Sequence, residues 1–185
     1  GDDVLQIKSE WASFGGRQTV YTHDSDTLGC AMELALFAPP QAAAGPVPVL
    51  TYLSGLTCTW ENAITKAGLQ AWAAEFGVIV VCPDTSPRGD DVPDAADEYD
   101  FGKGAGFYID ATEEPWSKNY RMYSYITDEL PRVLAGEIDD ADFGRQGIFG
   151  HSMGGHGALT IALKNPGTYK SVSAFAPIVA PMEVP

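Results

Sequence analysis

The chain has 185 residues, of which 45% are hydrophobic, and a formal net charge of −14. This length suits one domain with a substantial core, and the negative charge argues against nucleic acid or an anionic membrane surface as a partner. No apolar run could span a bilayer, and the first residues lack the features of a signal peptide. The three cysteines have no framework spacing, and no Cys/His cluster has the spacing of a metal site.

Strand patterns open the chain. Residues 4–14 and 28–37 predict two antiparallel strands. One face of the second strand carries the apolar side chains of Cys30, Met32, Leu34 and Leu36. The polar stretch 23–27 is typical of a turn, which would place His23 at the surface.

A parallel sheet is predicted from residue 47 onward. The nearly continuous apolar run 47–53 is typical of a parallel strand covered on both faces, and residues 78–82 repeat that pattern. Between them, residues 61–76 have helical periodicity, which Gly77 ends.

The second half of the chain continues the alternation. Residues 83–111 form a long irregular segment, which in a compact domain is usually functional. Residues 119–134 predict a helix that Pro131 kinks or shortens, and residues 145–149 and 171–176 predict two further strands. We therefore expect an α/β fold with a doubly wound, mostly parallel sheet and an antiparallel N-terminal strand pair.

The stretch that carries chemistry is QGIFGHSMGGHGALT, residues 146–160. Within it, residues 150–154 match G-x-S-x-G, the sharp strand-to-helix turn that exposes a nucleophilic serine in α/β hydrolases. Ser152 would sit at the tip of that turn, and the Met153 N–H would face a developing negative charge at the start of a helix. The pattern alone is weak, but an apolar strand end before it and an apolar helix after it provide the context that it requires.

Six stretches together resemble one family, the S-formylglutathione hydrolases, also called esterase D. They are LSGLTCT (53–59), PDTSPRG (83–89), DFGKGAGFYIDATEEPW (100–116), NYRMYSY (119–125), GHSMGGHGAL (150–159) and KNPGTYKSVSAFAPI (164–178). The resemblance runs over nearly the whole chain and implies an α/β-hydrolase fold. It also implies a cytoplasmic enzyme without a cofactor that hydrolyses the thioester S-formylglutathione to formate and glutathione, the last step of formaldehyde detoxification, and that also cleaves small carboxylic esters.

Carried over by position, the resemblance implies that Ser152 is the nucleophile and that the backbone N–H groups of Met153 and Leu56 form the oxyanion hole. The loop 54–58 follows a predicted strand, which is where a second oxyanion donor is expected in this fold. Cys58 matches a cysteine near the active site of many members, and both a modulatory role and simple packing remain open for it.

A formyl group has no side chain, so a tight acyl pocket would select it. Trp60, Trp116 and Met153 are candidates to fill that pocket, with ordinary core packing as the alternative. Four cations in or beside the long loops could pair with glutathione carboxylates, with surface solvation as the alternative: Arg88, Lys103, Lys118 and Arg121.

The acid–base partners of the serine are missing from the sequence. In this fold an Asp and then a His follow the nucleophile, but no residue after Ser152 is suitably placed. His156, one turn along the expected helix, is interpreted as packing, and His151 as pointing away from the serine. We expect one domain over residues 1–185 that is incomplete at its C-terminus, with the Asp, the His and the last strands in a C-terminal remainder.

Three functions follow from this interpretation. The first is S-formylglutathione hydrolase, the second is a general small-ester carboxylesterase or acyltransferase, and the third is an inactive fragment without its triad. The predicted strand 171–176 would then be an exposed apolar edge, so we expect residues 1–185 not to be stable and monomeric by themselves. A small-molecule substrate is the expected partner, and a homodimer is one alternative for the oligomeric state.

Overall fold

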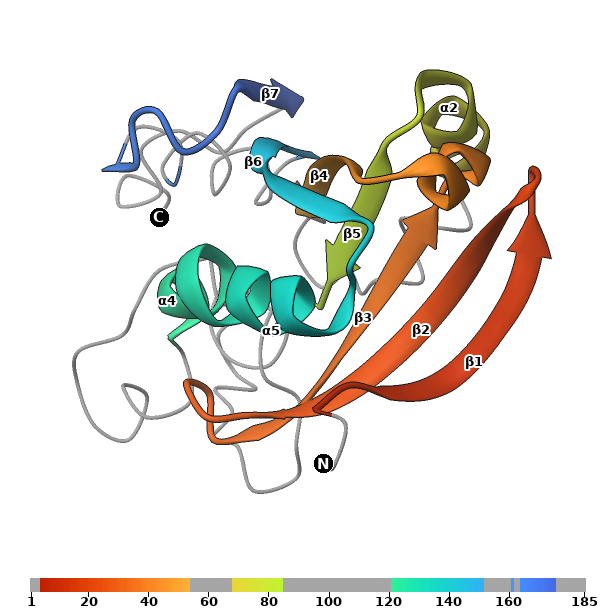
Figure 1. Ribbon diagram of the computed structural model, residues 1–185. Helices are drawn as coiled ribbons and strands as arrows, with labels where there is room; N and C mark the ends of the chain where they lie inside the picture. Colours follow the sequence, from red (N-terminus) through yellow and green to blue (C-terminus); the bar gives the residue numbers. More distant parts are fainter. Residues whose placement is uncertain (1–3, 54–67, 85–120, 152–160, 162–163, 176–185) are drawn as a thin grey trace.

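The computed structural model describes residues 4–53, 68–84, 121–151, 161 and 164–175, with the backbone alone for residues 151 and 171–175. Seven described strands form one sheet in the order β1-β2-β3-β5-β4-β6-β7 (Figure 1). They are β1 (Gln6–Ser13), β2 (Gly16–Ser25), β3 (Cys30–Ala38), β4 (Val47–Leu53), β5 (Ile79–Pro83), β6 (Ala141–His151) and β7 (Ser171–Phe175). The pairs β1–β2, β2–β3 and β3–β5 are antiparallel. The pairs β5–β4, β4–β6 and β6–β7 are parallel.

The N-terminal half contains one strand more than the sequence predicted. The turn expected at residues 23–27 is wrong in its position. Residues 23–25 belong to strand β2, which ends at Ser25, and the turn into β3 follows at residues 26–29. Strand β2 was missed because its buried side chains include polar ones, such as Gln18 and His23, so the apolar alternation is broken.

The β1–β2 connection is a two-residue hairpin. Ser13 pairs with Gly16, and the two residues between them both have positive φ, 47° at Phe14 and 76° at Gly15. Positive φ at both central positions is what a type I′ turn requires, because its twist matches that of the flanking strands. The predicted strand 4–14 is therefore too long at both ends: β1 begins at Gln6 and ends at Ser13, and Phe14 belongs to the turn.

Strands β4 and β5 confirm the predicted parallel sheet. β4 spans the predicted residues, and β5 is shifted by one residue from its prediction. The helix between them, α2 (Leu69–Phe76), ends at Gly77, whose φ of 67° is the left-handed conformation expected of a C-terminal glycine. The rest of the predicted helix, residues 61–67, and the predicted long segment 85–111 lie outside the described residues.

A second helical segment runs through α4 (Met122–Ser124), the π-helical stretch η2 (Tyr125–Glu129) and α5 (Leu130–Glu137). The predicted helix 119–134 is therefore confirmed from Met122 and extends to Glu137. Pro131 neither ends nor shortens it. Because proline has no N–H and its ring would clash with the carbonyl four residues earlier, the wider π turn before it accommodates the ring.

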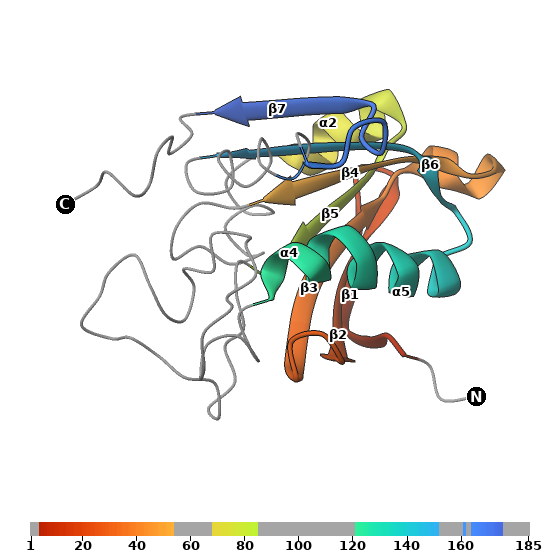
Figure 2. The same ribbon diagram turned by 90° about the vertical axis from the view of Figure 1, so that its left-hand side faces the viewer.

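Helices cover both faces of the sheet. α2 packs on one face, over a small cluster of Ala35, Phe37, Ala73, Val80 and Cys82. The segment α4–η2–α5 lies on the other face over the main core, and Figure 2 shows these two helical layers on either side of the strands. This is the doubly wound arrangement that the sequence predicted.

Candidate active site

Three parallel strands end at the same edge of the sheet. β6 pairs with β4 on one side and with β7 on the other, and their arrowheads point the same way in Figure 2. Leu53, the last residue of β4, is the register partner of Gly150, and His151 is the partner of Phe175. Because neighbouring strands lie about 4.8 Å apart, the chain leaves β4 and β6 at adjacent points.

This edge is also where the order of the strands reverses. The chain passes from β4 to β5 on one side of β4, and then from β5 to β6 on its other side. In open α/β sheets, ligands bind outside the carboxyl ends of the strands at such a switch point. The topology therefore marks the ends of β4 and β6 as the expected site.

The packing of β4 against β6 fixes this register. On the main-core face, Leu53 and Ile148 are fully buried. On the other face, the rings of Tyr52 and Phe149 meet at a centroid distance of 4.6 Å. Contacts on both faces prevent a slip by one residue, which would turn every buried side chain of the strand to the opposite face.

The residues predicted for the site are for the most part outside the described part of the chain. These are Ser152, Met153, Leu56, Cys58, Trp60, Trp116 and Lys118, together with Arg88, Lys103 and His156. Arg121 is described: its side chain is exposed, and its carbonyl accepts a hydrogen bond from the Tyr125 N–H at 3.0 Å, at the start of α4. The described residues thus end next to the predicted nucleophile, at His151, and three residues before Leu56, at Leu53.

A buried polar cluster, which the sequence analysis missed, joins β2 to η2. His23 Nε2 lies 2.8 Å from the Tyr125 hydroxyl, and the two rings are stacked with centroids 5.7 Å apart. The Ser25 hydroxyl donates to the Glu129 carboxylate, which also accepts from the Thr27 N–H at 2.8 Å. We call His23, Ser25, Tyr125 and Glu129 the β2–η2 polar cluster.

The sequence predicted His23 at the surface, and this prediction is wrong. Its side chain is 3% exposed, and its Nδ1 has no hydrogen-bond partner among the described residues. His23 and Tyr125 are 102 residues apart in the sequence, so no local pattern could have identified them as a pair. We interpret this buried imidazole, whose Nε2 is bonded to a phenol, as a structural element and not as the catalytic base.

Burial sets the protonation states in this cluster. Desolvation lowers the pKa of His23, an effect that the nearby Glu129 carboxylate partly offsets. Desolvation likewise raises the pKa of Tyr125 well above its usual value, and the charges of Glu129 and Asp84 add to this effect. At neutral pH both the imidazole and the phenol are thus uncharged, which suits their hydrogen bond.

We expect acid to destabilise the protein through His23. Because the pKa is lower in the folded state, the unfolded chain binds a proton below its ordinary pKa of 6.5 while the folded chain stays neutral. The stability contribution is thus complete above pH 6.5 and falls by up to about 1.4 kcal/mol per pH unit below it, until the lower folded pKa is reached. Urea unfolding between pH 5 and 8 should show this loss, and His23→Gln should reduce the slope.

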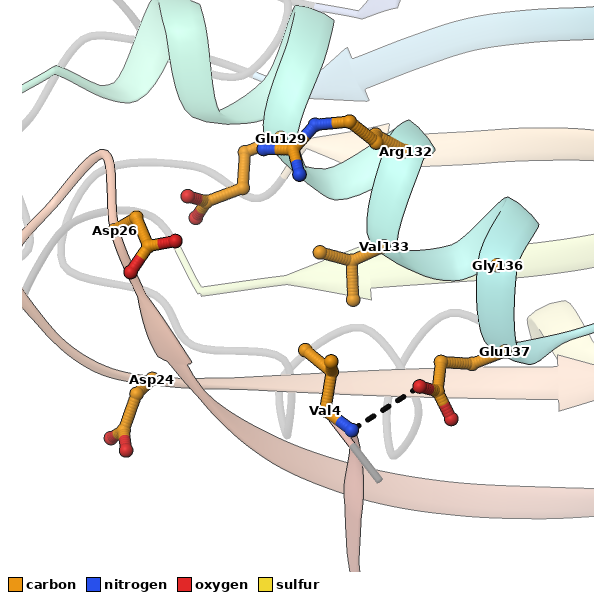
Figure 3. Close-up of a pocket in the computed structure, with 8 residues that line it drawn as sticks. All are labelled: Val4, Asp24, Asp26, Glu129, Arg132, Val133, Gly136 and Glu137. Atoms are coloured by element: carbon orange, nitrogen blue, oxygen red, sulfur yellow. Dashed lines mark hydrogen bonds between the residues drawn. The ribbon is translucent and has the colours of Figure 1, made fainter. Parts of the chain in front are cut away.

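One cavity formed by described residues has a volume of about 240 Å³. It lies between the end of β2, the segment η2–α5 and Val4, which precedes β1, and Figure 3 shows the side chains that line it. They are Val4, Asp24, Asp26, Glu129, Arg132, Val133, Gly136 and Glu137. None of the described residues that line this cavity is predicted for the active site, and their four carboxylates around one arginine do not suit an anionic substrate.

Metal ligands and membrane spans can be assessed only over the described ranges. Within them, no group of three or more His, Cys, Asp or Glu side chains could hold a metal ion. Within the same ranges, none of the helices has the length and apolar character needed to cross a bilayer.

Comparison with known proteins gives a consistent result. A family model described as putative esterase matches residues 25–185. The chain is 60% identical over 181 residues to S-formylglutathione hydrolase of Paracoccus denitrificans and 57% identical over 179 residues to that of Mus musculus. A solved S-formylglutathione hydrolase from Agrobacterium tumefaciens superposes with a TM-score of 0.94 at 58% identity.

Each of these three matches covers 97% of this chain, but the chain covers only 64%, 63% and 65% of the respective relatives. The chain thus spans a little under two thirds of the length of the relatives that it matches.

Proposed function

Because the chain belongs to the putative esterase family, which has the α/β-hydrolase fold, we propose that the protein is a serine hydrolase that cleaves S-formylglutathione to formate and glutathione. The observation that carries this proposal is the register of Leu53 opposite Gly150 at the strand-order switch point. It brings the chain segments that lead to Ser152 and to Leu56 out of adjacent strands at one edge. Those are the two segments from which a nucleophile and an oxyanion donor must come in this fold.

The proposed reaction is acyl transfer through a formyl-serine. The Ser152 oxygen attacks the thioester carbonyl, and the Met153 and Leu56 N–H groups stabilise the oxyanion, each contributing about 3 kcal/mol. The carbon–sulfur bond breaks, the glutathione thiolate leaves and takes up a proton, and water then hydrolyses the formyl ester by the same route. No step requires a cofactor.

The sequence after Ser152 contains no Asp, and its one His, His156, is interpreted as packing, so it does not supply the base or the acid that orients it. We propose that they come from the part of the relatives' length that this chain does not span. Assaying the two lengths of the protein would test this. The full-length protein should hydrolyse S-formylglutathione, and residues 1–185 alone should not. Activity of the 185-residue chain alone would contradict the idea.

For the substrate site, we propose that Trp60, Trp116 and Met153 border the acyl pocket and that Cys58 lies near it. We also propose that Lys118 and Arg121 bind the glutathione carboxylates. The exposed Arg121 side chain at the start of α4 is available for such a contact. We also propose a cytoplasmic location and a homodimer for the whole protein, which cell fractionation and sedimentation of the full-length protein would check.

The decisive assay compares two substrates. An S-formylglutathione hydrolase should have a kcat/KM for S-formylglutathione at least about 100-fold above that for p-nitrophenyl acetate, since specificity contacts of this kind are worth about 3 kcal/mol. Lys118→Gln with Arg121→Gln should raise KM for the thioester and leave KM for the neutral ester unchanged. A general carboxylesterase would show no preference for the thioester and no effect of the two substitutions.

A further inference from the structure

A hydrogen bond ties helix α4 to the turn that follows β6 in the chain. The Asn165 Nδ2 donates to the Tyr123 hydroxyl at 2.8 Å, across 42 residues of sequence. Lys164 Nζ lies 5.2 Å from the centroid of the Tyr123 ring, a cation–π distance. We call Tyr123, Lys164 and Asn165 the Tyr123 clamp.

The clamp continues into the main core through Asn165. The second hydrogen on Nδ2 bonds the Ile161 carbonyl at 2.8 Å, and the Asn165 backbone N–H bonds the same oxygen at 3.1 Å. Ile161 is fully buried in the main core. Ile161 and Lys164 both have helical backbone, and Lys164 is exposed. One amide group therefore fixes both the end of this helical turn and its distance from α4.

The α4 side of the clamp is itself held in place. Met122 and Tyr125, on either side of Tyr123, are fully buried, and the Thr127 hydroxyl donates to the Tyr123 carbonyl at 2.8 Å. Downstream of the clamp, the Lys170 N–H bonds the Gln146 carbonyl of β6 at 2.7 Å, just before β7 begins. Tyr123 thus connects a helix that packs on the main core to the segment that runs from β6 to β7.

Ser152 lies within the stretch of chain between these fixed points. His151, immediately before it, is paired in the sheet, and Ile161, nine residues after it, is anchored by the clamp. A reacting atom that is misplaced by about 1 Å can cost an enzyme about 100-fold in rate, so an anchor on the chain near a nucleophile can affect the reaction. We propose that Tyr123 is a positioning residue, which sets the orientation of the Ser152 nucleophile through Asn165; this rests on the function proposed above.

The test uses the full-length protein with Tyr123→Phe, Asn165→Ala and both together. The readouts are the rate of Ser152 labelling by a fluorophosphonate, followed by intact mass, and kcat and KM for p-nitrophenyl acetate. We expect each single variant to lower the labelling rate and kcat by about fivefold with KM unchanged. Because both act through one hydrogen bond, the double variant should be no slower than the slower single one.

Tyr169→Phe is the matched control. Tyr169 packs against the same core near Tyr123, and burial raises its pKa to about 12, but its hydroxyl makes no hydrogen bond to another described residue. This variant should label at the wild-type rate. Tyr123→Phe keeps the ring, its packing and the cation–π contact, so it should fold even if Asn165→Ala does not.

A structural role alone would give a different result. If Tyr123→Phe lowers the unfolding temperature but labels at the wild-type rate, or if the two substitutions act additively, the positioning role is overturned. If the wild-type protein itself is not labelled at Ser152, the proposed hydrolase function fails instead, and the two failures are thus distinguishable.

Discussion

Ser152→Ala should reduce hydrolysis of S-formylglutathione by the full-length protein by about 10⁴-fold or more. Alanine lacks the oxygen that forms the formyl ester, so only the oxyanion donors and substrate binding would remain to accelerate direct attack by water. The substitution should leave substrate affinity unchanged, because the hydroxyl acts in the reaction and contributes little to ground-state binding. The measurement is kcat by formate release, together with the dissociation constant of the intact thioester on the inactive variant.

Ser13→Ala is a suitable control for this experiment. Ser13 is the last residue of β1, at the antiparallel end of the strand order, and its replacement removes a hydroxyl of the same kind. It should retain wild-type activity. Activity of Ser152→Ala within about tenfold of wild type would exclude Ser152 as the nucleophile, since residual catalysis without the nucleophile is far weaker than this.

Tyr125→Ala should lower the free energy of unfolding by about 4 kcal/mol. Tyr125 is fully buried and is among the largest side chains of the main core, so alanine would leave a cavity between η2 and the sheet. The His23 Nε2 would also lose its partner inside the protein. Urea unfolding monitored by circular dichroism at pH 7.5 would measure the change.

Two further variants separate packing from hydrogen bonding. Tyr125→Phe keeps the ring but not the hydroxyl, so it should cost only about 1 to 2 kcal/mol. Trp72→Ala removes an aromatic side chain that is 42% exposed on α2, and it should cost clearly less than Tyr125→Ala. If Tyr125→Ala were no more destabilising than Trp72→Ala, the β2–η2 polar cluster and its surrounding core could not be an important source of stability.

The regular elements were predictable where the local pattern was unambiguous. β4 has the limits that its apolar run predicted, and α2 ends at the glycine that was expected to stop it. Both rest on local causes, namely burial on both faces of a parallel strand and the left-handed conformation that glycine adopts without strain. An esterase family could also be inferred from the residues around Ser152 together with the family resemblance, and the match of the putative esterase family model agrees with it.

The predictions failed where the partner of a residue lies far away in the chain. β2 and its buried His23 were misread because polar side chains are predicted to face water unless a hydrogen-bonding partner is known. Those partners, Tyr125 and Glu129, are supplied by η2 about a hundred residues later. The passage of the helical segment through Pro131 likewise depended on the π turn before it, which no local propensity indicates.

The sequence by itself thus determined the α/β class, the positions of most strands and the candidate nucleophile, because these depend on residue type and on local periodicity. Only the tertiary structure decided that β6 lies beside β4, that Leu53 faces Gly150 and that Tyr123 bonds Asn165. Strand order, register and buried polar pairs depend on contacts between residues distant in sequence, whose free energy is realised only when the whole core packs.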